Sequence, residues 1–171
     1  RAALTYNFNE DLSATLGIGR YFKIPTYTQL GYQNNGIFVN ENLSYVQSDH
    51  VTVGIKKYFG NTSLLSVEGF LKSYSNYPVS ILDEISLANK GAGFEVLGNE
   101  EVESTGKGRS YGLELLYQQK LSNNFYGLFS YTFFFSEFSG LDPDIYKRSS
   151  WDSRHLASFT GGYKLKKNWE I

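Results

Sequence analysis

Apolar and polar residues alternate with a period of two along most of this chain. The clearest example covers residues 108–118, where one set of alternate positions is apolar and the other is mostly polar or Gly. Successive side chains of a strand point to opposite faces of a sheet, so the pattern predicts a strand with one apolar and one polar face. The apolar set is Tyr111, Leu113, Leu115 and Tyr117, and the other includes Ser110, Gly112, Glu114 and Gln118.

Six further segments alternate in the same way, and the residues after the last of them resemble the start of another strand. The segments are 4–8, 12–18, 51–56, 65–72, 125–135 and 157–165. The longest of them reach the roughly 9–11 residues that a tilted strand needs to cross a hydrocarbon layer, whereas ordinary strands average about 5–6 residues. We therefore predict seven complete strands and the beginning of an eighth.

The connections between these segments alternate between short and long. Turn-forming residues make the short ones, at Asn9-Glu10-Asp11, Gly60-Asn61-Thr62, Leu121-Ser122-Asn123-Asn124 and Lys166-Lys167-Asn168. The long ones cover 23–46, 73–107 and 136–153. Outer-membrane barrels combine tight periplasmic turns with long extracellular loops. The fold class that this predicts is all-β, an antiparallel transmembrane β-barrel segment.

Composition agrees with such a wall. Aromatic residues make up 17% of the chain, and the mean hydropathy of −0.34 suits a sheet whose two faces differ. The net charge of −1 gives no attraction to nucleic acid, and the absence of Cys excludes disulfides and cysteine metal sites. Several aromatic residues flank the predicted turns and loops, where membrane-interface girdles place rings: Tyr21, Phe22, Tyr58, Phe59, Phe125, Tyr126 and Trp169.

Candidate chemistry is sparse. Asp152-Ser153-Arg154-His155 holds the side-chain types of a hydrolytic triad, but neighbouring strand residues point to opposite faces, so we predict that Asp152 and Arg154 pair or cap a loop-to-strand junction. Each His has too few neighbouring ligands for a transition metal. The acidic loop 95–103 suits a solvated surface better than a calcium site. We predict no catalytic, cofactor or metal residues, and the ligand-binding residues stay unassigned.

The long loops are rich in aromatic residues, which either stack on a ligand or pack the loops against each other. The sequence leaves these two roles open for each ring. The residues are Tyr27, Tyr32, Phe38, Tyr45, Tyr74, Tyr77, Phe138, Tyr146 and Trp151.

Several short motifs, in order, resemble the barrels of TonB-dependent receptors. Residues 19–26 are similar to that family's "R-x-P-T" segment, and Asn40-Glu41-Asn42-Leu43 with Ser48-Asp49-His50 and Val53-Gly54-Ile55 is similar to its loop-to-strand stretch. Residues 106–114 resemble the "A-x-G-x-E" start of a strand, and Ser150-Trp151-Asp152-Ser153-Arg154-His155 resembles "P-x-D-x-R-H". The sequence around 97–112 and 117–121 most resembles that of receptors from Bacteroidetes-type bacteria.

The resemblance implies a 22-stranded barrel with an N-terminal plug domain, energised by TonB, in the outer membrane of a Gram-negative bacterium. Residues 1–171 would then be an internal segment of the barrel, with the plug, the signal peptide and the C-terminal strands outside it. Expected partners are the lipid bilayer, the plug domain and the TonB complex, with a surface lipoprotein left open. Polar groups expected to face the lumen are Glu68, Lys72, Glu114 and Lys164.

The function that follows is active uptake of a scarce extracellular solute, whether iron chelate, cobalamin, oligosaccharide or peptide. One alternative is a soluble aromatic-rich β-sheet module that binds carbohydrate or acts as an adhesin. Such a module would bury the face of Tyr111, Leu113, Leu115 and Tyr117 against a second sheet, whereas a membrane wall exposes it. A third reading is a passive porin, which would not respond to loss of TonB.

Overall fold

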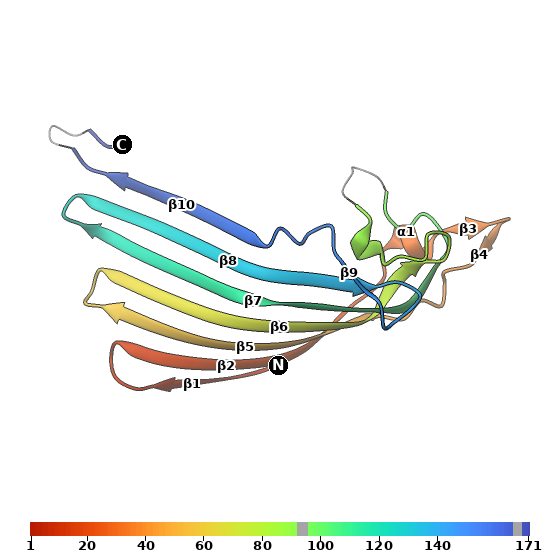
Figure 1. The fold of residues 1–171 in the computed structure, drawn as a ribbon, viewed down its shortest axis with the longest axis horizontal. Helices are drawn as coiled ribbons and strands as arrows, with labels where there is room; N and C mark the ends of the chain where they lie inside the picture. Colours follow the sequence, from red (N-terminus) through yellow and green to blue (C-terminus); the bar gives the residue numbers. More distant parts are fainter. Residues whose placement is uncertain (92–95, 166–168) are drawn as a thin grey trace.

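The computed structural model describes residues 1–91, 96–165 and 169–171 and contains one large antiparallel sheet (Figure 1). Its long strands follow the order β1-β2-β5-β6-β7-β8-β10, and short β9 pairs with β8. The predicted all-β class and the seven alternating segments are thereby confirmed. The strands are β1 Ala2–Asn7, β2 Leu12–Lys23, β5 Val46–Phe59, β6 Ser63–Ser80, β7 Val102–Ser122, β8 Phe125–Ser139, β9 Tyr146–Arg148 and β10 His155–Tyr163.

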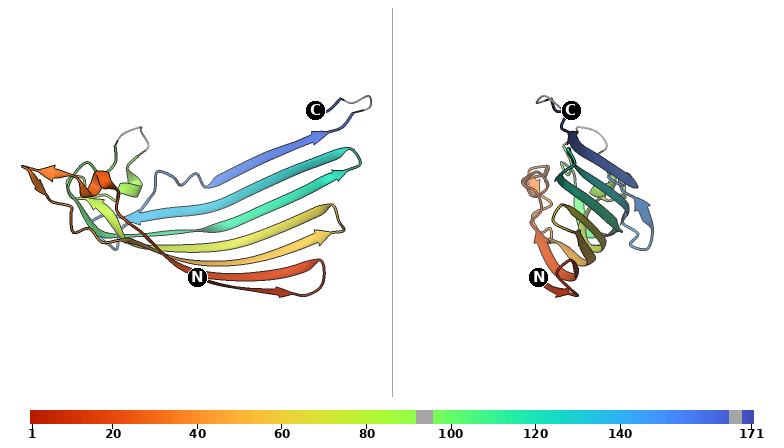
Figure 2. Two further views of the ribbon diagram at one scale, coloured as in Figure 1. Left: turned by 180° about the vertical axis from the view of Figure 1, so that it is seen from behind. Right: turned by 90° about the vertical axis from the view of Figure 1, so that its left-hand side faces the viewer.

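The long strands form a meander, each paired with the next one along the chain. Figure 2 shows them side by side in a curved sheet, with β1 and β10 at opposite edges. After β10, Lys164 forms an antiparallel bridge with Glu170, and the Tyr163 N–H donates to the Ile171 carbonyl at 2.8 Å. This isolated bridge is compatible with the predicted beginning of an eighth strand, but no further strand is assigned among residues 169–171. The predicted turn at 166–168 itself lies outside the described residues.

Local side chains and backbone angles explain the short turns. The Asn9 Oδ1 accepts hydrogen bonds from the backbone N–H groups of Asp11 and Leu12, both at 2.9 Å, and Gly60 takes the φ of +57° that the second turn needs. The third turn is shorter than predicted, because β7 continues to Ser122 and only Asn123 and Asn124 connect it to β8. Their φ values of +48° and +67° fit a two-residue type I′ hairpin turn.

Two of the three long connections are also shorter than predicted. The first, residues 24–45, agrees with the prediction, but β6 extends to Ser80 and β7 begins at Val102, which reduces the second to 81–101. In the sequence, the glycines at 106 and 108 favour a loop, which is why the second connection was predicted to be longer. In the structure a Cβ on Gly108 would lie only 2.3 Å from the Phe138 ring, so the missing side chain makes room for that ring within a continuous sheet. The third connection, 140–154, contains β9.

The sheet has the two faces that the alternation predicts. On the apolar face one row of paired residues crosses all seven long strands: Leu4, Leu16, Val53, Gly69, Leu113, Phe133 and His155. On the polar face the neighbouring row is Thr5, Thr15, Gly54, Glu68, Glu114, Thr132 and Leu156. The described residues leave the apolar face uncovered, and Leu113 is 56% exposed. From Tyr111 to Leu121 on β7, at about 3.4 Å per residue and about 40° tilt, it spans roughly 26 Å, the height of a barrel's lipid-facing band.

The predicted aromatic girdle is only partly correct. Strand parity places Phe22, Phe59 and Phe125 on the apolar face but Tyr21, Tyr58 and Tyr126 on the polar face. The error arises because two adjacent aromatic residues of a strand cannot share a face. Other rings contribute at the short-turn end of the apolar face: Tyr6, Phe8, Tyr117, Phe129, Phe159 and Tyr163.

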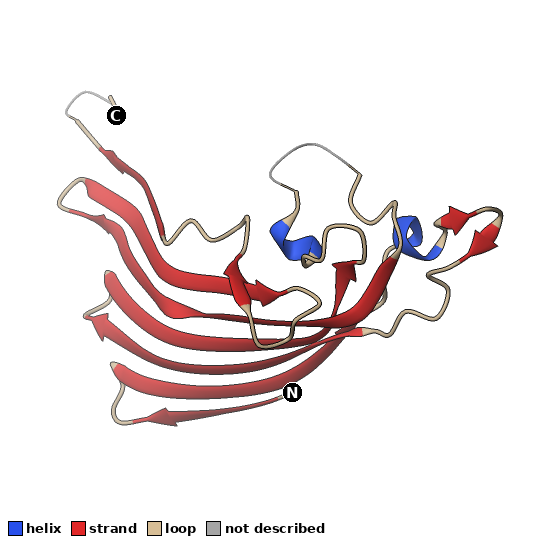
Figure 3. Ribbon diagram, turned by 45° about the vertical axis from the view of Figure 1, so that its right-hand side comes forward, coloured by secondary structure: helices blue, strands red, loops and turns tan. Residues whose placement is uncertain are grey.

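Buried apolar side chains gather at the loop end of the sheet. Among the described residues the buried hydrophobic ones are Val79, Leu87, Ala88, Val102 and Phe138. Figure 3 shows short α1 (Tyr27–Leu30), η1 (Leu87–Asn89) and the β3–β4 hairpin (Gln33–Asn34, Ile37–Phe38) at this end. No helix in the described part of the chain is long and apolar enough to cross a membrane.

Candidate functional site

The loop end of the sheet is built by the first loop (24–45), the second loop (81–101) and the third loop (140–154). The first loop begins with a capping box around α1: the Thr26 N–H donates to Gln29 Oε1 at 3.1 Å, and the Gln29 N–H donates to Thr26 Oγ1 at 3.4 Å. Gln29 is buried, and its side chain rests on Gly98, where a Cβ would lie 2.4 Å from Gln29 Cγ. The second loop therefore needs Gly at this position to approach α1.

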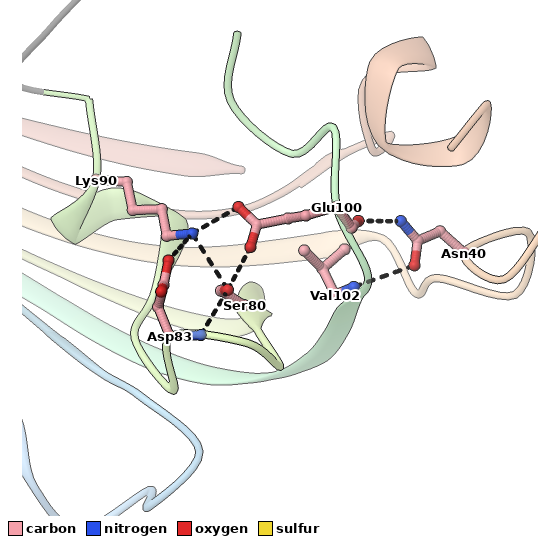
Figure 4. Close-up of polar contacts among 6 residues, drawn as sticks. All are labelled: Asn40, Ser80, Asp83, Lys90, Glu100 and Val102. Carbon is pink, nitrogen blue, oxygen red and sulfur yellow. Dashed lines mark hydrogen bonds and ion pairs between the residues drawn. The ribbon is translucent and has the colours of Figure 1, made fainter. Parts of the chain in front are cut away.

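Asn40 joins the first and second loops (Figure 4). Its Nδ2 donates to the backbone carbonyls of Gln29 at 3.0 Å and Glu100 at 2.7 Å, and its Oδ1 accepts from the Val102 N–H at 3.1 Å. Asn40 is 1% exposed, so these partners replace water completely. One amide side chain thus fixes the first loop to Val102, the first residue of β7, which is 62 positions away in sequence.

Lys90 holds the second loop closed on itself. Its ammonium pairs with Asp83 and, at 2.6 Å, with Glu100, while Glu100 also accepts from Ser80 Oγ (Figure 4). Burial lowers the pKa of Lys90, but the hydrogen bonds and charges of Asp83 and Glu100 outweigh it and raise that pKa above its ordinary value. Glu100, part of the predicted acidic surface, is therefore engaged by a cation of the protein.

The third loop is organised by Asp152, whose side chain is fully buried. Its carboxylate accepts from the Ser136 N–H at 3.1 Å and pairs with Arg154 at 3.2 Å and Arg148 at 3.5 Å. The predicted role of Asp152 and Arg154 at a loop-to-strand junction is confirmed. The argument from opposite faces was wrong, however: Arg154 has φ +62°, so it and His155 both lie against the apolar face.

His155 and its neighbours do not form a triad. The His155 Nδ1 hydrogen-bonds to the Tyr131 hydroxyl at 2.7 Å, and the ring packs 5.0 Å from that of Phe133. The Asp152 carboxylate contacts two arginines and accepts from the backbone N–H groups of Ser136 and Arg154, and none of the hydrogen bonds of the described residues joins it to the imidazole. The other histidine, His50, lies on the polar face and hydrogen-bonds through Nε2 to Ser48 Oγ at 2.7 Å. These geometries provide no nucleophile with a base and an orienting acid.

The loops enclose an inter-loop cavity of about 190 Å³ on the polar side of the sheet. Lys23 and Val46, which pair in register on the polar face, lie at its edge. It is lined by Lys23, Ile24, Pro25, Thr26, Gln29, Val46, Tyr77, Pro78, Leu87, Ala88, Leu97 and Trp151. Apolar surface with one ammonium and an indole suits binding of a solute, since the lining offers no set of acid and base groups for a reaction.

The loop aromatics divide between the two roles that the sequence left open. Tyr74 and Tyr77 lie in β6 and not in a loop, and they pack on Phe138 of β8, with ring centroids 5.3 Å and 4.7 Å from it. Tyr77 also lines the inter-loop cavity. Tyr27 and Trp151 are exposed, by 92% and 66%. Trp151 also lines the inter-loop cavity, which makes it the aromatic residue best placed for a ligand.

Below the cavity the polar face of the sheet forms a hydrophilic surface, which we call the polar wall. Glu68 and Glu114 are directly opposite each other on β6 and β7, and Lys72 lies on the same face, paired in register with His50. Like charges at directly opposite positions destabilise a sheet unless water or a partner separates them. The predicted grouping of Glu68, Lys72 and Glu114 on one face is thus found in the structure. Lys164, the fourth residue of that prediction, lies just after β10 and bridges Glu170.

Sequence reasoning missed the residues that assemble the loops, namely Asn40, Ser80, Lys90 and the cavity position of Trp151. Asn40 belongs to one of the family-like motifs, which was the only signal available for it. Lys90 precedes a Gly-rich run and carries no local pattern that distinguishes it from a solvated lysine.

Solved structures with the same fold include bacterial outer-membrane receptors. The ferric-catecholate import receptor Fiu from E. coli K12 matches with a TM-score of 0.69 and 13% identity, covering 96% of this chain and 22% of that one. The pyoverdine outer-membrane receptor FpvA from Pseudomonas aeruginosa PAO1, bound to pyoverdine, matches with 0.66 and 19%, covering 96% and 22%. The FpvAI–pyocin S2 complex matches with 0.67 and 18%, covering 96% and 20%.

The chain therefore spans about a fifth of the length of these receptors. The comparison with curated proteins finds no match. A family model, described as "TonB dependent receptor-like, beta-barrel", matches residues 1–171. The members of that family are transporters of the Gram-negative outer membrane and not enzymes, and this chain belongs to the TonB-dependent receptor β-barrel family.

Proposed function

We propose that this chain is part of an active-transport receptor that captures a scarce extracellular solute at the inter-loop cavity and admits it past the polar wall. The observation that carries the proposal is the convergence of the three loops around that cavity, on the side of the sheet opposite the apolar face. A solute held there would lie directly above the polar wall. Ferric chelates are the class to test first, because Fiu is named as a ferric-catecholate import receptor and FpvA is bound to pyoverdine.

The wider assembly is part of the proposal. The strand meander supports membership in a larger barrel, for which we propose 22 strands, an N-terminal plug inside it, and TonB as the source of energy. Residues 1–171 would be an internal segment of that barrel in a Bacteroidetes-type receptor. A surface lipoprotein that covers the loops stays a further hypothesis.

The structure favours this proposal over a soluble carbohydrate-binding module. Such a module would need a second sheet over the apolar face, whereas the described residues leave that face uncovered and Val53, Ile55 and Leu113 more than half exposed. A passive porin fits the wall equally well, but it has no need for loops fixed to each other through a buried side chain such as Asn40.

Uptake of a labelled ferric catecholate by cells that express the native protein tests the transport step. We expect saturable uptake that disappears when TonB is deleted or the proton gradient is collapsed. Uptake that survives both treatments would establish the porin alternative instead. No uptake of ferric catecholate, cobalamin, oligosaccharide or peptide would refute the receptor function.

Replacement of Trp151 tests the site itself. Trp151→Ala removes the exposed indole from the cavity, and we expect about tenfold weaker solute binding, the loss typical of one well-placed aromatic contact. Tyr27→Ala is the matched control, because Tyr27 is an exposed aromatic of the first loop that does not line the cavity. Equal affinity of both variants would move the binding site away from the inter-loop cavity.

A further inference from the structure

The apolar face changes from apolar to charged within one step along the strands. Its last apolar row toward the loops is Ile18, Val51, Leu71, Tyr111 and Phe135, and the next row on the same face is Arg20, Asp49, Ser73, Arg109 and Glu137. Receptor barrels carry their long loops outside the cell. This boundary therefore lies where the headgroups of the outer leaflet meet the protein.

The charges at this boundary are not balanced on the side of β7 to β10. We define the arginine cluster as Arg109, Arg148 and Arg154, whose side chains are 49%, 55% and 30% exposed. Their acidic partners are Glu137, 22% exposed, and Asp152, fully buried. The accessible surface is thus mainly guanidinium, and each guanidinium keeps N–H donors beyond those used in its ion pair.

Aromatic rings fix the cluster at the edge of the apolar face. The Arg109 guanidinium lies 4.6 Å from the centroid of the Tyr146 ring, and that of Arg154 lies 4.1 Å from the centroid of Phe135. Stacked guanidinium groups are held in place while their N–H edges stay available to an anion. By contrast, Arg20 is closed into a two-bond pair with Asp49, at 2.6 Å and 3.0 Å.

A groove runs along the apolar face next to this cluster. It has a volume of about 480 Å³ and lies over Gly69, where the absence of a side chain lowers the surface between Val53 and Leu113. The groove has an apolar lining that includes Phe135, and the Arg154 guanidinium lies over the Phe135 ring. The groove and the arginine cluster are therefore one continuous surface with a cationic end and an apolar channel.

We propose that this surface binds one phosphorylated lipid of the outer leaflet, with its phosphate on the arginine cluster and an acyl chain in the groove over Gly69. Charge complementarity selects the anionic headgroup, and the groove selects the attached chain. A free phosphate would leave the groove empty, and a neutral lipid would leave the guanidinium donors unused. The site rests on the membrane location of the family and is independent of the transported solute.

Native mass spectrometry of the protein extracted from its outer membrane tests the headgroup. Lipid A, which carries phosphates and acyl chains, is the probe, and its dephosphorylated form is the control ligand. We expect Arg109→Gln with Arg148→Gln to weaken lipid A binding roughly tenfold, because charge-assisted hydrogen bonds are lost. Arg20→Gln should leave it unchanged. Equal binding of the two lipid forms, or no effect of the double variant, would overturn the proposal.

A second pair of variants tests the groove. A Cβ on Gly69 would lie 3.5 Å from the nearest Leu113 methyl carbon, an ordinary contact, so Gly69→Val places a side chain in the groove with room for its Cβ. The matched control is Gly54→Val on the polar face of β5, where the nearest atoms also lie at 3.5 Å. We expect lipid A retention to fall severalfold only in Gly69→Val. Retention that is equal in both variants would contradict the acyl-chain half of the proposal even if the arginine variants fail to fold.

Discussion

The sheet of paired long strands, called the wall below, and the loop end of this molecule are stabilised in different ways. In the wall, strands that are neighbours in sequence pair through short turns, and the apolar face is left exposed to the surrounding phase. At the loop end, polar side chains such as Asn40 and Lys90 connect segments that lie far apart in sequence or fold a loop on itself. The wall therefore needs lipid for its stability, whereas the loop end has its own small core.

This contrast explains why the sequence predicts the structure of the wall well and the structure of the loop end poorly. An alternating strand repeats its signal at every second position, so a few exceptions such as Leu116 do not obscure it. A buried amide that accepts and donates at the right places gives one signal at one position. We expect substitutions in the two regions to differ accordingly in size and in what they depend on.

The largest expected effect comes from a charge on the apolar face of the wall. Leu115→Lys places an ammonium among lipid chains and should cost roughly 2–4 kcal/mol of the free energy of unfolding, as measured by urea titration in lipid vesicles. Leu116→Lys is the matched control, because Leu116 is an adjacent, equally half-exposed leucine on the polar face. Equal losses in the two variants would mean that the apolar face does not contact lipid.

Loss of the Asn40 amide should have the next largest effect, and it should be confined to the loop end. Asn40→Ala leaves the Val102 N–H and the Glu100 carbonyl without partners, at about 2–3 kcal/mol, while the Gln29 carbonyl keeps the Tyr32 N–H at 3.3 Å. Hydrogen exchange at the Val102 amide should accelerate while exchange in the wall stays slow. Asn42→Ala, an exposed residue of the same loop, is the control. Faster exchange throughout the sheet would show that the two regions are not independent.

Much of the wall was predictable from the sequence because its determinants are local. The alternation at 108–118 and the turn at Gly60-Asn61-Thr62 each lie within a few residues. The strand ends near Ser80 and Val102 were not predictable, because β6 and β7 continue through bulges between Tyr74 and Val79 that rely on Phe138 packing from β8. A ring that arrives from another strand has no trace in the local pattern.

Less of the candidate site was predictable. The sequence identified aromatic loops and named Trp151, but the cavity requires Thr26, Leu97 and Trp151 to meet from three separate loops. Likewise Arg154 could not be placed on a face, since its φ of +62° interrupts the alternation just before β10. The family-like motifs indicated which parts of the chain to examine, and only the contacts in the structure identified the residues that form the candidate site.

A moderate effect is expected at the third short turn, which tests how far local chemistry defines the wall. Asn124 has φ +67°, which a β-branched residue adopts only with strain, so Asn124→Val should cost about 1–2 kcal/mol. Asn61→Val, in a short turn but without a positive φ, should cost less. Urea titration of both variants in the same vesicles provides the comparison. A larger loss for Asn61→Val would contradict the hairpin geometry.

The smallest effect concerns pH and should appear only at the loop end. Because Asp83 and Glu100 raise the pKa of Lys90, its ion pairs contribute stability that is fully present below the ordinary lysine value of 10.5 and is lost as the pH rises through the raised pKa. A spin label on a Cys in place of exposed Glu101 should gain mobility above about pH 10.5, whereas a label in place of Glu10, in a short turn, should not. In a Lys90→Gln background the label at 101 should be mobile at neutral pH already and show no alkaline step. An increase in label mobility at alkaline pH that persists in that background would assign the transition to another titrating group. The ion pairs of Lys90 would then not be what holds the second loop closed.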